Sequence, residues 1–248
     1  MKGDEAVGWY NATYTLLSVL TFIPMAYSTA LFPVMSRLHI SSEEMLRFTY
    51  ARSMKYMLIL GLPVGVGTTL LDDRIIAQIF GADFSSSVLA LRILVWAVVL
   101  QFAGGIFTQL FDSTNRQRTT TLLIGITVLN NLVFDLILTP VYGIYGTAAA
   151  TAGNAALFLA LGYILSYKFG HGLSPKILLG TVLRVMSAST AMAFFVIYFE
   201  SLSMYMLIPV GALIYFTVIC LVRGFDKEDL ELLRQIIRRD GTGQASTG

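Results

Sequence analysis

The chain has 248 residues, of which 56% are hydrophobic and only 13% are charged, and its net charge is +2. Soluble domains carry about 25% charged residues, so this composition, with a mean hydropathy of +0.72, excludes a soluble globular protein and indicates an integral membrane protein. The basic residues flank apolar segments and form no basic face for nucleic acid, and the single cysteine, Cys220, excludes a disulfide framework and a cysteine-based metal site.

Seven apolar segments are long enough to cross a bilayer. A helical span needs about 20 residues for a hydrocarbon core of about 30 Å. In lipid, the backbone N–H and C=O groups of such long segments can all be hydrogen-bonded only if the segments are helical. We therefore expect an all-α, polytopic membrane helix bundle. The predicted spans cover residues 10–32, 54–71, 90–110, 119–139, 146–167, 178–199 and 202–222.

Local signals surround the second span. Ser41 and Glu44 are spaced as in a capping box, so a helix is expected to begin after Ser41 and to run into this span. Pro63 removes a backbone donor and predicts a bend in the helix. The following residues, 72–92, are amphipathic, which predicts a short interfacial helix that starts in solvent at Asp72.

Three regions follow from this pattern. Residues 1–222 are expected to form the transmembrane bundle. Residues 223–240 place apolar side chains on one helical face and basic ones near their C-terminal end, which predicts a cytoplasmic amphipathic helix on the membrane surface. Residues 241–248 are small and polar, so a disordered tail is expected.

The basic residues predict an orientation. Fourteen of the 17 Lys and Arg residues fall on one side of the predicted spans, and only Lys2, Arg74 and Arg92 fall on the other. Because cytoplasmic loops are rich in Lys and Arg, we expect a protein of the cytoplasmic membrane with its N-terminus outside and its C-terminus inside. An outside N-terminus without a signal peptide favours at least one further helix ahead of Met1.

Two spans carry polar residues at helical spacing. Residues three and four apart share a helix face, so each set forms a stripe. The third span contains Gln101, Gly105, Thr108 and Asp112, and the fourth contains Thr127, Asn131 and Asp135.

These polar groups allow two interpretations. Amides and hydroxyls often join helices by hydrogen bonds inside bundles. For Gln101, such an interhelical hydrogen bond and a place in the wall of a water-filled cavity are the two interpretations. A carboxylate such as Asp135 is a more expensive group in hydrocarbon and favours a functional role. Arg184 in the sixth span can extend to the inner headgroups or face a cavity and bind an anion. The Gly- and Ala-rich fifth span is expected to serve close packing.

No catalytic constellation is visible. The sequence contains no nucleophile, base and acid set, no glycine-rich phosphate loop and no metal-binding spacing, so neither an enzyme nor a cofactor or metal site is expected. A membrane enzyme of lipid-sugar metabolism would predict an acidic cluster in a loop, and no such cluster occurs.

Four short motifs carry a family resemblance. They are VGWY at 7–10, LFPVMS at 31–36, IFGADF at 79–84 and TPVYGIYGTA at 139–148. In this order, and on consistent sides of the membrane, they resemble the polysaccharide-biosynthesis flippases of the multidrug, oligosaccharidyl-lipid and polysaccharide exporter superfamily.

The resemblance implies a fold and a function. Such flippases have fourteen helices in two lobes and move polyprenyl-linked sugars outward by alternating access; this chain looks like the C-terminal lobe. It would bind membrane lipids and a lipid-linked sugar, and another chain or a longer one would supply the N-terminal lobe. The implied cavity residues are Gln101, Asn131 and Asp135, and the implied contacts of the diphosphate are Arg116, Arg118 and Arg184.

Two alternatives stay open. Within the superfamily, a cation-coupled exporter of drugs or metabolites would use Asp135 as its coupling residue. Alternatively, this chain is half of a transporter and has no transport activity of its own. It would then act as an interaction partner or be a non-functional truncation.

Overall fold

The computed structural model describes residues 4–225, which fold into helices without any strand. The seven α-helices are all long and apolar enough to cross a membrane, as predicted. The amphipathic helix predicted over 223–240 lies outside the described residues from residue 226 onward, as does the tail over 241–248. The helices are α1 (Asp4–Ser41), α2 (Glu43–Ile79), α3 (Ser87–Ser113), α4 (Gln117–Tyr142), α5 (Ile144–Lys168), α6 (Pro175–Tyr198) and α7 (Met204–Leu221), with a short 3-10 helix η1 (Ala82–Phe84).

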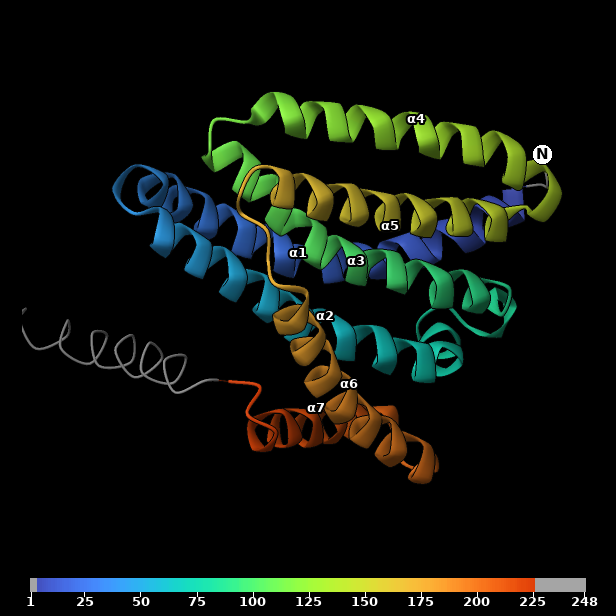
Figure 1. The fold of residues 1–248 in the computed structure, drawn as a ribbon. Coiled ribbons are helices and arrows are strands. Elements are labelled where there is room, and N and C mark those ends of the chain that lie inside the picture. The colour runs from blue at the N-terminus through green and yellow to red at the C-terminus, as the bar shows by residue number, and fades with distance from the viewer. Residues whose placement is uncertain (1–3, 226–248) are drawn as a thin grey trace, which may run out of the picture.

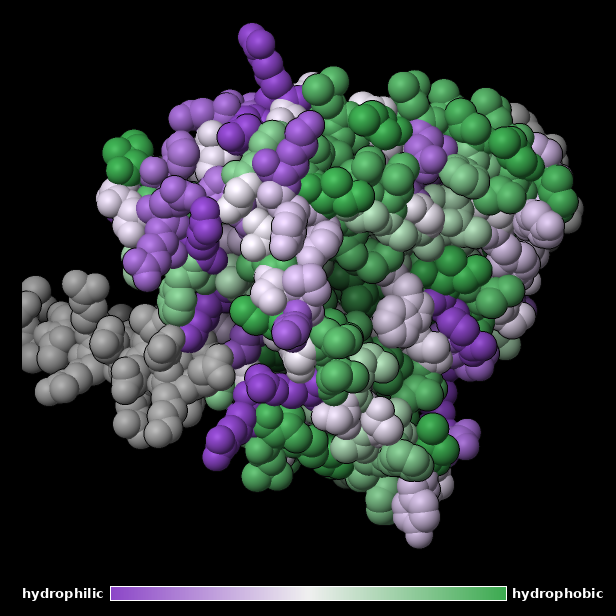
Figure 2. Space-filling view, in the orientation of Figure 1, coloured by the Kyte–Doolittle hydropathy of each residue, from purple (hydrophilic) through white to green (hydrophobic). Residues whose placement is uncertain are grey.

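Consecutive helices run in opposite directions (Figure 1). One end of the bundle, which we call the first end, therefore contains the start of α1, the α2–α3 connection, the α4–α5 turn and the α6–α7 turn. The α1–α2, α3–α4 and α5–α6 connections lie at the opposite, second end. Figure 2 shows hydrophilic residues gathered over the second end, at the left, while hydrophobic residues cover much of the sides of the helices, as expected for surfaces that face lipid.

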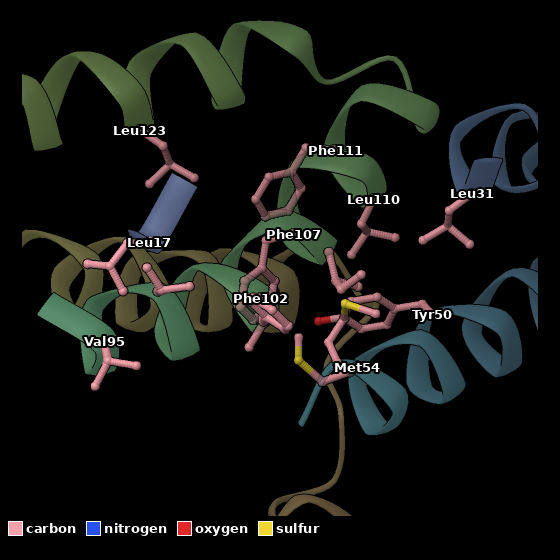
Figure 3. Packing of buried hydrophobic residues seen from close by; sticks show 14 of the residues in the cluster. Leu17, Leu31, Tyr50, Met54, Val95, Phe102, Phe107, Leu110, Phe111 and Leu123 are labelled. Carbon is pink, nitrogen blue, oxygen red and sulfur yellow. The ribbon is translucent and has the colours of Figure 1, made fainter. Parts of the chain in front are cut away.

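Helix α3 is the centre of the bundle. It packs against α1, α2 and α5, whereas α4 lies outermost and contacts mainly α5. Figure 3 shows Phe102, Phe107 and Phe111 along α3 with Tyr50 and Met54 of α2 beside them. The Tyr50 and Phe107 rings lie 6.1 Å apart between centroids, and all five side chains are buried. The same cluster includes Leu17 of α1, Leu123 of α4 and Ala148 of α5, so one apolar core joins α1–α5.

Helices α6 and α7 form a separate pair. They pack against each other and against α2, and Figure 1 shows them diverging from α3, α4 and α5. A second cluster of buried apolar residues, which includes Ile59, Met192 and Tyr215, fills the space between α2 and this pair. Helix α2 thus connects the five-helix group α1–α5 to the α6–α7 pair.

Two predictions around α2 are wrong. The N-cap is Ser42, not Ser41: its side chain accepts a hydrogen bond from the Met45 backbone N–H, and Ser41 still belongs to α1. The interfacial helix is also absent, because α2 continues without interruption through Asp72 to Ile79. Asp72 is not a solvated helix start, since it is 1% exposed and packs against α3.

The turn between α4 and α5 is shorter than predicted. Helix α4 continues through Pro140 to Tyr142, and Gly143 alone reverses the chain with a φ of 61°. A Cβ at Gly146 would overlap the backbone of Leu138, so this position needs glycine for the close approach of the two helices.

Candidate functional site

The predicted polar face of α3 lines a cavity. Gln101, Gly105 and Thr108 of α3 meet Thr151 and Asn154 of α5 around a space of about 370 Å³. The Asn154 Oδ1 is buried, and no hydrogen-bond partner for it is found within residues 4–225. We call this space the neutral cavity, because no charged side chain lines it.

Asp112, the fourth residue of that stripe, has a local role. Its carboxylate accepts a hydrogen bond from the Thr120 hydroxyl at 2.7 Å, and its carbonyl accepts one from Gln117 Nε2 at 3.2 Å. Both bonds join the end of α3 to the beginning of α4. Asp112 therefore fixes the α3–α4 connection and does not line the neutral cavity.

Asp135 lies at a second cavity, closer to the first end. This space of about 660 Å³ lies between α1, α4 and α5 and is lined by Tyr10, Asp135 and Thr147, with mainly apolar residues around them. The Thr139 and Thr147 hydroxyls in its wall lie 2.9 Å apart. Oδ1 of Asp135 is buried and has no hydrogen-bond partner in the part of the chain that the structure describes. We call this space the acidic cavity.

The other residues of the α4 stripe do not join Asp135. Asn131 is half-buried and lines neither cavity. Thr127 is buried, but its hydroxyl donates to the carbonyls of Leu123 and Ile124 in its own helix. Of the fourth-span residues predicted for a site, only Asp135 is placed in a cavity.

Helix α5 contributes to both cavities, which the sequence reasoning missed. Thr147 lines the acidic cavity, and Thr151 and Asn154 line the neutral one. Their spacing of four and three residues is the pattern that identified the stripe on α3, and it was available in the sequence. Because Thr147 and Thr151 are one turn apart, the two cavities follow each other along α5.

The predicted arginines lie at the second end and line neither cavity. Arg116 is the N-cap residue of α4, and its guanidinium carbon lies 3.9 Å from the centroid of the Phe169 ring, in cation–π geometry. Arg118, in the first turn of α4, is exposed. Arg184 belongs to α6, where its Nη1 donates to the carbonyl of Arg223 at 3.4 Å. The fold therefore puts Arg184 on the α6–α7 pair and the other two on the five-helix group.

The described residues contain no group of three or more His, Cys, Asp or Glu side chains that could hold a metal ion. The polar groups of the neutral cavity are amides and hydroxyls, which can donate and accept hydrogen bonds but hold no charge. The arrangement suits recognition of an uncharged polar molecule inside an apolar bundle.

Curated relatives share part of their length with this chain. The protein "Probable low-salt glycan biosynthesis flippase Agl15" of Haloferax volcanii is 25% identical over 152 residues, which are 61% of this chain and 32% of the relative. The "Probable flippase AglR" of the same organism is 26% identical over 166 residues, which are 65% of this chain and 34% of the relative. The matched part is thus about a third of each relative.

A solved structure has the same fold. The "Lipid II flippase MurJ, inward closed conformation" superimposes with a TM-score of 0.75 at 18% identity, covering 90% of this chain and 48% of that chain. The family model described as MatE matches residues 1–137, more than half of the sequence. The protein is therefore a multi-pass membrane protein of the MatE family, within the multidrug, oligosaccharidyl-lipid and polysaccharide exporter superfamily that its motifs indicated.

Proposed function

We propose that this chain forms one lobe of a flippase that moves a polyprenyl-linked oligosaccharide across the cytoplasmic membrane. The observation that carries the proposal is the neutral cavity, where Gln101, Thr108, Thr151 and Asn154 present amides and hydroxyls within transmembrane helices. The names of the relatives and the fold shared with a lipid II flippase support this choice.

The chemistry of the cavity fits a sugar. A sugar that leaves water loses hydrogen bonds from each hydroxyl, and every unreplaced bond costs free energy in an apolar environment. The Gln101 amide, the Asn154 amide and the threonine hydroxyls can replace such bonds. These uncharged groups can pair with the hydroxyl and N-acetyl groups of a sugar. The lipid chain stays in the bilayer.

The diphosphate needs different partners. Arginine binds phosphate oxygens with paired N–H donors, and Arg116 and Arg118 both belong to the beginning of α4. We assign them to the first contact with the diphosphate, and we assign Arg184 of the α6–α7 pair to a further contact. The second end then faces the cytoplasm, which agrees with the concentration of basic residues there and puts the N-terminus outside.

A second lobe completes the transporter. Alternating access requires two bodies that rock against each other around one site. The shared regions make up 32% and 34% of the curated relatives and 48% of the solved flippase, so they leave room for such a lobe. We propose that it comes from a longer chain or from a second protein.

The acidic cavity favours one alternative, a cation-coupled exporter. Asp135 offers a buried carboxylate oxygen without a partner among the described residues, and the hydroxyls of Thr139 and Thr147 stand in the same wall. A carboxylate can accept a proton, and carboxylate and hydroxyl oxygens can bind a small hard cation. Such coupling also suits a sugar flippase, so the transported molecule decides between the two functions.

The test measures the location of the lipid-linked oligosaccharide in cells that lack this protein. The wild-type gene is expected to restore transfer of the glycan to the outer leaflet, and a Gln101→Ala/Asn154→Ala variant with equal membrane expression is expected to restore it poorly. Full transfer by this variant would contradict the role of the neutral cavity. Export of a soluble drug without any glycan transfer would favour the alternative.

A further inference from the structure

Pro63 leaves one carbonyl of α2 without its helical donor. In an α-helix the carbonyl of Ile59 accepts the N–H of residue 63, and proline has no N–H. The structure supplies a substitute from another helix: the Tyr215 hydroxyl of α7 donates to the Ile59 carbonyl at 2.7 Å. This bond crosses from the five-helix group to the α6–α7 pair at a point near the middle of α2.

The substitute bond lies where water cannot replace it. Tyr215 is 1% exposed and Ile59 is 2% exposed, and both belong to the apolar cluster between α2 and the α6–α7 pair. An orphaned backbone carbonyl in this environment would cost the free energy of its desolvation. The Tyr215 hydroxyl thereby ties α7 to the one backbone position of α2 that the proline has left open.

The surrounding side chains are small on the α2 side. Gly61 and Gly65 flank Pro63, and added Cβ atoms there would lie 3.2 Å from the Phe102 ring and 2.7 Å from Val99. These glycines let α3 pack directly against the backbone of α2. The segment 59–65 is therefore packed against α3 through Gly61 and Gly65 and bonded to α7 through the Ile59 carbonyl.

A second attachment lies at the first end. Arg74, near the end of α2, donates through Nη1 to the Leu202 carbonyl at 3.3 Å and through Nη2 to the Glu200 carbonyl. The α6–α7 turn is thus held by its backbone. Like the Tyr215 bond, this contact ends on α2, so the α6–α7 pair is attached to the five-helix group along α2.

We propose that Pro63 and Tyr215 form a pivot about which the α6–α7 pair moves against the five-helix group. The proline weakens the internal hydrogen bonding of α2 at one position, and the tyrosine converts that position into an attachment point for α7. Tyr215 is a positioning residue, not a ligand of the substrate. Its use during transport rests on the proposed function, whereas the pairing itself does not.

A double-mutant cycle tests the pairing in the purified full chain. Tyr215→Phe keeps the ring but removes the donor, and it is expected to lower the apparent Tm by about 4 °C. In Pro63→Ala the alanine N–H can bond to Ile59, so adding Tyr215→Phe to this variant should change the Tm by less than about 1 °C. Equal losses in both backgrounds would overturn the pairing. Tyr205→Phe, at a 75% exposed residue of the same helix, is the matched control.

A distance measurement tests the pivot. Cys220 on α7 is exposed and is the only cysteine, and an added Cβ at Gly125 on α4 meets no atom within 4 Å. Spin labels at Cys220 and Gly125→Cys therefore report the position of α7 against the five-helix group. Tyr215→Phe should broaden the distribution of distances between the two labels. The distribution should be equally broad in Pro63→Ala/Tyr215→Phe, although the tyrosine substitution costs this variant little Tm. A distribution that Tyr215→Phe leaves unchanged would overturn the pivot.

These readouts need no substrate, so they separate the two proposals. A wild-type chain with the expected thermal cycle and distances but no glycan transfer would contradict only the proposed function. Normal glycan transfer with additive thermal losses would contradict only the pivot.

Discussion

Arg92 of α3 holds Asp72 of α2 by two hydrogen bonds, from Nε to Oδ2 at 2.6 Å and from Nη2 to Oδ1 at 3.2 Å. The Asp72 side chain is 2% exposed, and its Oδ1 also accepts the backbone N–H of Asp73 at 2.8 Å. The pair joins the end of α2 to the beginning of α3 across the turn that contains η1. A buried carboxylate with this much support is a structural element of the first end.

Arg92→Ala is expected to destabilise the protein more than its exposed position suggests, because it leaves the Asp72 carboxylate buried without a counter-charge. The apparent Tm in detergent checks this. The double variant Asp72→Asn/Arg92→Ala should have a higher Tm than Arg92→Ala alone, since both charges are then removed. Arg47→Ala is the control, because the Arg47–Glu43 pair is exposed on both sides and should change the Tm little. A loss for Arg92→Ala no larger than the control would refute this role.

Gly162 and Gly153 provide a matched pair on α5. An added Cβ at Gly162 would lie 2.7 Å from the Phe107 ring, which is 2% exposed and enclosed, whereas one at Gly153 meets nothing within 4 Å. Gly162→Ala should therefore lower the free energy of unfolding by about 1–3 kcal/mol. Gly153→Ala should be neutral or raise it by up to about 1 kcal/mol. Thermal unfolding of both variants checks the packing of α5 on α3, and equal stability would contradict it.

Asn154→Ala should separate stability from transport. Because Oδ1 of Asn154 is buried without a partner among the described residues, removal of the amide should leave the Tm unchanged or raise it. Loss of one hydrogen bond to the sugar should lower glycan transfer by about 2- to 10-fold. A variant that loses stability and transport in parallel would indicate that the amide serves packing only.

The sequence was sufficient for the seven spans but not for the contacts between them. Hydropathy and length locate a helix in lipid with little ambiguity, whereas Asp72 and Arg92 are 20 residues apart and meet only because α2 and α3 pack there. The residues of the α4 stripe separate for a geometric reason: a step of four residues turns about 400°, so Thr127 and Asp135 point in different directions.

The neutral cavity could have been predicted more fully. Thr147, Thr151 and Asn154 are separated by four and three residues, as are Gln101, Gly105 and Thr108. The Gly- and Ala-rich sequence of α5, however, indicated close packing alone. The structure shows that α5 serves both purposes, because Gly162 packs against α3 while Thr151 and Asn154 face the cavity. Arg116 shows the limit of sequence reasoning, since nothing near it in the sequence indicates stacking on Phe169.

Asp135→Asn tests the role of the acidic cavity. The amide keeps the size of the side chain but removes the charge that a proton or cation would neutralise. If Asp135 couples transport to an ion, glycan transfer should fall about 5-fold or more and should no longer respond to collapse of the proton or sodium gradient. Asn131→Ala, at a residue that lines neither cavity, is the control. Unaltered gradient dependence in Asp135→Asn would remove Asp135 from the coupling.

Cys220 reports the orientation of the chain without any mutation. It is exposed in the last turn of α7, next to the second end, and no other cysteine is present. A membrane-impermeant thiol reagent should label it in inside-out vesicles and not in intact cells. Ser201→Cys in a Cys220→Ser background, with its thiol in the α6–α7 turn at the first end, should give the opposite pattern. Labelling of Cys220 in intact cells would contradict the proposed orientation.

Whether the neutral cavity accepts the sugar of a lipid-linked oligosaccharide is best measured as glycan transfer to the outer leaflet. The variant Gln101→Ala/Asn154→Ala is compared with Gly153→Ala in this measurement. Expression and Tm are measured for both variants, so that a loss of transfer is not caused by a loss of folded protein. We expect a loss of transfer in the first variant and normal transfer in the second. Normal transfer in both variants would contradict the proposed role of the neutral cavity.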